Sequence, residues 1–141
     1  MKKEILDKIE ENARKIKELR GAIIHNSIDI EKGISFLIIK SFFKDKGNNE
    51  IIKKLMLEEQ YNFGVKINML KDFIIKEPYY GFFKEIKRLK DIRNIFAHAP
   101  LEWISGGIIH NNKLKNPKEL HDEFFKLHGK LLNELNKLIN K

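Results

Sequence analysis

Residues 79–98 read YYGFFKEIKRLKDIRNIFAH and contain one glycine and no proline. Their apolar residues recur at intervals of four, three and seven, which is the spacing of one face of an α-helix: Phe82, Ile86, Leu89 and Phe96. Pro100 follows, and a proline disfavours the helical conformation of the residue before it. The pattern therefore predicts a helix over about Tyr79 to His98, with one face buried against other helices.

Arg93 falls in the gap of this apolar face, four residues after Leu89 and three before Phe96. Helix geometry predicts that it points into the apolar seam. A buried guanidinium keeps its charge, so it needs a carboxylate or phosphate partner. Asp29 and Glu31 are the first supporting acids to consider, and such a pair could also serve only as a structural clamp. In either case Arg93→Ala is expected to destabilise the fold by leaving a carboxylate unpaired.

Asn94 and His98 are four residues apart and share the adjacent helix face, with Lys87 on an earlier turn. A neutral imidazole can take a proton from a ribose hydroxyl near neutral pH, and an arginine can stabilise a crowded phosphate. Taken alone, a histidine at a helix C-terminus is also favoured by the helix dipole. The three residues Arg93, Asn94 and His98 in register favour a functional site.

The string from Asp91 to His98 (DIRNIFAH) resembles the motif of the HEPN superfamily, an Arg followed by a polar residue, three more positions and a His. In its fuller form Asn follows the Arg and Ala precedes the His, as they do here. Residues 63–70 (FGVKINML) resemble the stretch before the motif helix in mannitol-repressor-like HEPN relatives. The resemblance spans roughly Ile24 to Pro100, and the last helix matches only in kind.

This resemblance implies an all-α, antiparallel helical bundle that forms a homodimer, with the two motifs meeting across the two-fold axis. It implies a metal-independent endoribonuclease without a cofactor, in which His98 is the general base or acid. Arg93 would bind the phosphate and stabilise the transition state, and Asn94 would orient both. Cleavage would use the ribose 2′-hydroxyl and leave a cyclic phosphate. Such proteins are often toxins or antiviral defence effectors, so an antitoxin or regulatory protein partner is expected.

The histidine content gives a separate reason to expect a dimer. Acid–base cleavage of RNA needs both an acid and a base, and the motif offers one histidine per chain. A symmetric dimer would place two copies of His98 and Arg93 in one cleft. The other downstream histidines have no such context and are expected at the surface: His110, His121 and His128.

The sequence outside the motif predicts a single domain over residues 1–141 with four main helices and short extra helices. A first helix is expected over about 3–24 and a second from Ser27 or Asp29 to about residue 43, with a break or bend at residues 25–27. A turn at 45–49 precedes a short helix at about 50–59 and another at about 63–75.

The C-terminal part of the chain has clear boundaries. Residues 101–115 are irregular and suit a loop with a short hairpin through Ile108 and Ile109. The last helix is expected to begin with Asn116 as its N-cap and Pro117 at its first position. An apolar stripe then marks its buried face: Leu120, Phe124, Leu127, Leu131, Leu135 and Leu138.

The composition favours RNA as a partner. The chain has 28 Lys and Arg against 20 Asp and Glu, a formal net charge of +8, although lysine-rich composition can also follow from the genome. Four basic residues of the motif helix could form an RNA-facing patch, and a solvated helix face explains them almost as well: Lys84, Lys87, Arg88 and Lys90.

Other classes of function are less well supported. The main alternative to a ribonuclease is a non-catalytic HEPN module for regulation or protein interaction. A DNA-binding repressor is poorly supported, because the sequence shows no helix-turn-helix pattern. The chain has no cysteine, which excludes thiolate metal sites. It has neither a signal-peptide pattern nor an apolar run that could cross a membrane, so a cytoplasmic protein is expected.

Overall fold

The computed structural model describes residues 2–42, 63–73, 80–102 and 105–140. Within these ranges the chain forms four helices and one two-stranded antiparallel sheet. In chain order the elements are α1 (Lys2–Phe42), α3 (Phe63–Phe73), α4 (Tyr80–His98), β1 (Ile108–His110), β2 (Lys113–Lys115) and α5 (Pro117–Ile139). The expected turn at 45–49, the expected short helix at 50–59, residues 74–75 and Tyr79 lie outside the described residues.

Helix α1 continues through residues 25–27, so the expected break there is wrong. The polar side chains bond within the helix itself: Asn26 Nδ2 donates to the carbonyl of Ala22 at 2.7 Å, and Ser27 Oγ donates to the carbonyl of Ile24 at 2.8 Å. Such bonds satisfy a polar side chain without ending the helix. Ile23 and Ile30, on either side, are both fully buried. Tertiary packing therefore keeps residues 25–27 helical although their local sequence disfavours a helix.

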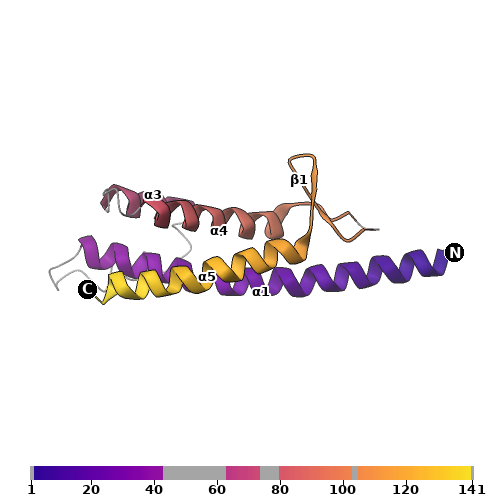
Figure 1. Ribbon diagram of the computed structural model, residues 1–141, viewed down its shortest axis with the longest axis horizontal. Coiled ribbons are helices and arrows are strands. Elements are labelled where there is room, and N and C mark those ends of the chain that lie inside the picture. The colour runs from indigo at the N-terminus through magenta and orange to yellow at the C-terminus, as the bar shows by residue number, and fades with distance from the viewer. Residues whose placement is uncertain (1, 43–62, 74–79, 103–104, 141) are drawn as a thin grey trace.

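The three long helices do not all alternate in direction (Figure 1). Helix α4 runs antiparallel to α1 and α5, whereas α1 and α5 lie side by side and run in the same direction. The expected antiparallel orientation is therefore found for α4 against both of its long neighbours, but not for the pair of α1 and α5.

The core lies where the three long helices meet, and α5 packs most extensively against α1. Gly33 permits the close approach of these two helices, because a Cβ at this position would lie 2.9 Å from Cδ1 of Leu135. The fully buried large side chains come from every helix and from β1: Ile23, Ile30, Ile34, Ile38, Leu70, Ile86, Leu89, Ile92, Phe96, Ile108, Phe124 and Leu131.

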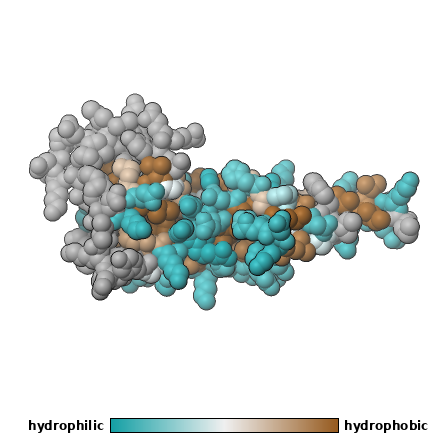
Figure 2. All heavy atoms as spheres, turned by 90° about the horizontal axis from the view of Figure 1, so that it is seen from above, coloured by the Kyte–Doolittle hydropathy of each residue, from teal (hydrophilic) through white to brown (hydrophobic). Residues whose placement is uncertain are grey.

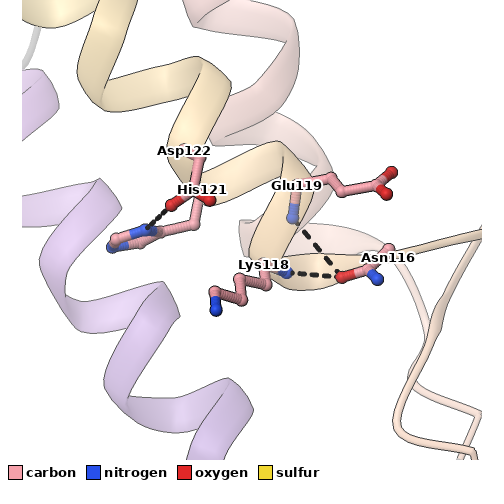
Figure 3. A network of polar contacts seen from close by, with 5 residues as sticks. All are labelled: Asn116, Lys118, Glu119, His121 and Asp122. Carbon is pink, nitrogen blue, oxygen red and sulfur yellow. Dashed lines mark hydrogen bonds and ion pairs between the residues drawn. The ribbon is translucent and has the colours of Figure 1, made fainter.

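Helix α5 begins as the sequence predicts (Figure 3). Asn116 is the N-cap, and its Oδ1 accepts hydrogen bonds from the backbone N–H groups of Lys118 at 2.9 Å and Glu119 at 3.4 Å. Pro117 occupies the first helical position, where its missing N–H has no cost. The capped start fixes where the chain leaves the hairpin and enters the bundle.

Two exposed regions complete the architecture. The N-terminal end of α1 extends beyond the other helices, and it carries the exposed side chains of Ile5 and Leu6. Seen from the side of α4, hydrophilic side chains cover most of the middle of the described surface (Figure 2). None of the helices that the structure describes is long and apolar enough to pass through a bilayer.

Candidate functional site

An open cleft of about 860 Å³ lies at the C-terminal end of α4. Asn94 and His98 both line it, so the two motif residues expected to act together face the same space. The walls come from α4, the segment after it, the hairpin and the start of α5. The lining residues are Arg88, Asp91, Asn94, Ile95, His98, Ala99, Pro100, Ile109, His110, Asn111, Lys115 and Leu120.

The end of α4 is fixed by a contact that sequence reasoning missed. The carbonyl of Phe96 would normally accept a bond from residue 100, but Pro100 has no N–H to donate. Arg20 of α1 replaces it, with Nε donating to the carbonyl of Phe96 at 2.6 Å. A cation at this point also suits the negative end of the helix dipole. Arg20 therefore positions the helix end that carries His98.

Arg93 borders the apolar seam instead of entering it. The seam passes through Ile92, which is fully buried, while Arg93 is only half-buried and its Nη1 donates to Oδ1 of Asn94 at 3.1 Å. Helix periodicity predicted no seam residue between Leu89 and Phe96, and Ile92 occupies that position. Arg93 thus lies next to the cleft without being one of its lining residues.

The two acids expected to support Arg93 have other partners. Oδ2 of Asp29 lies 3.5 Å from Nε2 of His128, and Oε1 of Glu31 lies 3.4 Å from Nζ of Lys66 on α3. Among the described residues, neither acid pairs with Arg93. The expected clamp between Arg93 and α1 is therefore wrong, and Glu31 instead pairs with the buried ammonium of Lys66.

The histidines expected at the surface are all at least half-buried. His128 retains 12% of its side-chain exposure, and its ring stacks on Phe124. Its Nε2 lies 3.5 Å from Asp29 but makes no hydrogen bond within the described residues. His121 packs against Phe125 and approaches Asp122 (Figure 3). His110 lines the cleft. His121 and His128 flank the apolar stripe of α5, which explains their partial burial.

The hairpin is the part of the cleft that the motif did not reveal. Strands β1 and β2 pair antiparallel, as the sequence predicts, with His110 opposite Lys113. Asn111 and Asn112 form the turn with φ of 51° and 60°. Asparagine tolerates this left-handed conformation and suits two-residue hairpins. The Asn-Asn pair is the sequence signal that could have located the hairpin tip.

Arg88 does not belong to a free basic patch. Its Nε lies 2.5 Å from Oε2 of Glu123, and its Nη2 donates to Oε1 of the same carboxylate at 2.8 Å. The hydrogen bond from Arg88 lowers the pKa of Glu123, and the same bond raises the pKa of Arg88. This bidentate pair ties α4 to α5 beside the cleft and compensates the charge of the arginine.

We expect Glu123→Gln to lower the free energy of unfolding by about 0.5 kcal/mol at neutral pH, because both partners are more than 40% exposed and solvent screens them. The lowered pKa of Glu123 means that the contribution is complete above its unfolded-state pKa and disappears as the pH falls through the lower folded-state value. Urea unfolding across acidic to neutral pH measures this, with the exposed Glu10→Gln as control. If wild type and Glu123→Gln still differed in their free energy of unfolding in strong acid, the ion pair would not be the source of the difference.

The remaining lysines of the expected patch line a second groove of about 370 Å³ between α3 and α4. Lys84, Lys87 and Lys90 come from α4 and Lys71 comes from α3, with the ring of Phe83 beside them. Lys87 precedes Asn94 by two helical turns on the same side of α4, which places the two about 10 Å apart along the axis. The groove and the cleft therefore lie along the same side of α4.

The described residues contain no group of three or more His, Asp or Glu side chains arranged to hold a metal ion. No protein-family model, curated protein or solved structure matches this chain.

Proposed function

We propose that this chain is a HEPN-type, metal-independent endoribonuclease that cuts RNA through the ribose 2′-hydroxyl, acting as a toxin-like or defence-associated effector in the cytoplasm. The proposal rests above all on one observation. Asn94 and His98 line the same open cleft, and Arg93 is hydrogen-bonded to Asn94 at its edge. The motif thus combines a proton-transfer group, a polar orienting group and a permanent cation at a site that RNA could enter.

Each motif residue has a role that suits its position. His98 is exposed at the end of α4, where its imidazole can exchange a proton with the ribose or the leaving oxygen. Asn94 holds the guanidinium of Arg93 through its side-chain oxygen and leaves its amide nitrogen for other partners. Arg93 stabilises the charge that gathers on the phosphate during the displacement.

A homodimer remains part of this proposal, because the HEPN resemblance implies that two motifs meet across a two-fold axis. Each chain would then bring one cleft to the shared site. An antitoxin or another regulatory protein would restrain the enzyme. The extended end of α1, with Ile5 and Leu6 exposed, is a suitable surface for a protein partner.

The lysine groove supports RNA as the substrate, and it gives a quantitative expectation. Lys87→Gln should weaken the binding of single-stranded RNA several-fold and reduce the slope of log K against log salt by about 0.7, the value for one lost phosphate contact. Uncleavable 2′-O-methyl RNA allows the measurement without turnover. The exposed Lys17→Gln on α1 is the matched control. If the two variants bound RNA equally, with equal slopes of log K against log salt, the groove would not be part of the RNA-binding surface.

The substrate test compares an RNA oligonucleotide with the same oligonucleotide carrying 2′-deoxyribose at the cleaved nucleotide, both with chelator present. We expect cleavage of the first alone, leaving a 2′,3′-cyclic phosphate and a 5′-hydroxyl. The 2′-oxygen is the nucleophile, so its removal stops the reaction. Cleavage of both, or a requirement for a divalent metal ion, would reject the proposed chemistry.

A non-catalytic HEPN module for regulation or protein interaction is the second candidate. The exposed apolar side chains at the free end of α1 favour it, since they suit protein contact and have no role in RNA cleavage. This candidate predicts that His98→Ala leaves partner binding and biological function intact. The ribonuclease proposal predicts the loss of both cleavage and cellular effect.

A further inference from the structure

The cleft contains a second imidazole from the same chain. His110 of β1 is half-buried and lines the cleft together with His98 and Asn94. The histidines come from different elements and are twelve positions apart in sequence, so helix periodicity could not associate them. A single protomer therefore brings two proton-transfer groups to one space.

The backbone holds His110 at this end of α4. The N–H of Ile109 donates to the carbonyl of Pro100 at 2.9 Å, and Leu101 bridges to Ile108, whose side chain is buried. The chain thus folds back on the segment that follows the motif. These contacts make the position of His110 a property of the fold and not of a free loop.

The ring of His110 has a partner that suits either protonation state. The side-chain amide of Asn111 lies 3.3 Å from Nε2 of His110. An amide can present its nitrogen to a neutral ring or its oxygen to a protonated one. Asn111 can therefore remain a partner of the ring when its protonation state changes.

We propose that His110 is the second acid–base group of the cleft, paired with His98 of the same chain; this rests on the proposed ribonuclease function. The ribose 2′-oxygen attacks the phosphorus, so the O2′–P bond forms and the P–O5′ bond breaks. One imidazole takes the proton of the 2′-hydroxyl, and the other, as imidazolium, gives a proton to O5′. The products are a cyclic phosphate and a 5′-hydroxyl, and no co-reactant is needed. The partner's His98 is not needed for this step.

The test compares wild type, His110→Ala and His98→Ala on two RNA substrates that differ only at the scissile bond. One has the normal 5′-oxygen, and the other has a 5′-bridging sulfur, which leaves without protonation. On the oxygen substrate each variant should lose about 10²-fold or more in rate, the usual contribution of general acid–base catalysis. On the sulfur substrate one of the two variants should recover most of its rate, which identifies the acid.

Two control variants isolate the imidazole. Lys113→Ala changes the hairpin residue opposite His110, and His25→Ala removes an exposed histidine of α1. Both should cleave within about threefold of wild type, far less than the effect of losing a general acid or base. Circular dichroism verifies that every variant is folded, and His110→Gln replaces His110→Ala if the latter is not.

Three results would overturn the inference while leaving the proposed ribonuclease intact. The first is His110→Ala cleaving at the wild-type rate when His98→Ala is inactive. The second is a loss in His110→Ala with neither variant recovering on the sulfur substrate. The third is restored cleavage on co-expressing His98→Ala and His110→Ala chains, which would place the pair across two protomers. An inactive wild type would instead reject the proposed function itself.

Discussion

Arg93→Ala is expected to lower the rate of RNA cleavage by about 10³-fold, while the free energy of unfolding changes by less than about 1 kcal/mol. The rate should fall because the guanidinium stabilises the charge of the phosphate in the transition state. Stability should be largely retained because Arg93 is half-buried and its hydrogen bond goes to Asn94, not to a buried carboxylate. A buried ion pair of Arg93 with an acid of α1 would instead have led us to expect a large loss of stability.

Single-turnover cleavage and urea unfolding of the same protein preparations measure the two effects. Arg93→Lys is the matched variant, since lysine keeps the charge but lacks the planar, bidentate fork. We expect its cleavage rate to fall between those of wild type and Arg93→Ala. Full activity of Arg93→Ala would show that Arg93 does not take part in cleavage. A large loss of stability would show that Arg93 has a structural role.

Glu31→Ala is expected to lower the free energy of unfolding by about 3 kcal/mol. The side chain of Lys66 is 5% exposed, and its ammonium lies 3.4 Å from the Glu31 carboxylate. Removing the carboxylate leaves a buried cation unpaired, which is costly. Lys66→Met should be milder, because it removes the buried charge itself and leaves a half-buried acid that solvent can reach.

Urea or thermal unfolding of both variants measures this difference. Glu18→Ala is the matched control, because it breaks the ion pair with Arg14 in which both side chains are about two-thirds exposed. Exposed pairs of this kind contribute about 0.5 kcal/mol or less. If Glu31→Ala cost no more than Glu18→Ala, the pair would not be a buried clamp between α1 and α3.

The sequence predicts best where local signals agree with packing. The start of α5 follows from Asn116 and Pro117, which supply the cap and the first helical turn regardless of the surrounding fold. The end of α4 follows from Pro100. The hairpin near Ile108 is also predicted, although its Asn-Asn turn was not recognised as the signal.

The errors arise where tertiary contacts decide. His25-Asn26-Ser27 has the composition of a break, yet side-chain bonds to the helix backbone and the burial of Ile23 and Ile30 keep α1 continuous. Helix periodicity placed Arg93 in the seam because it did not assign Ile92 to the core.

The candidate site was predicted only in part. Asn94 and His98 share one helix face, so their common exposure to the cleft follows from local geometry. His110 and Lys115 reach the cleft through the hairpin, and Arg20 reaches the end of α4 from α1 across 76 positions of sequence. No periodic pattern within one element could have revealed these associations.

The most direct test of the central claim is the cleavage of a mixed pool of RNA by wild type and His98→Ala, with chelator present. His98 is exposed at the end of α4, so its replacement should leave the fold intact. We expect wild type to produce fragments with cyclic phosphate ends and His98→Ala to produce none. Equal cleavage by the two proteins, or no cleavage by either, would contradict His98-dependent catalysis and favour the interaction module.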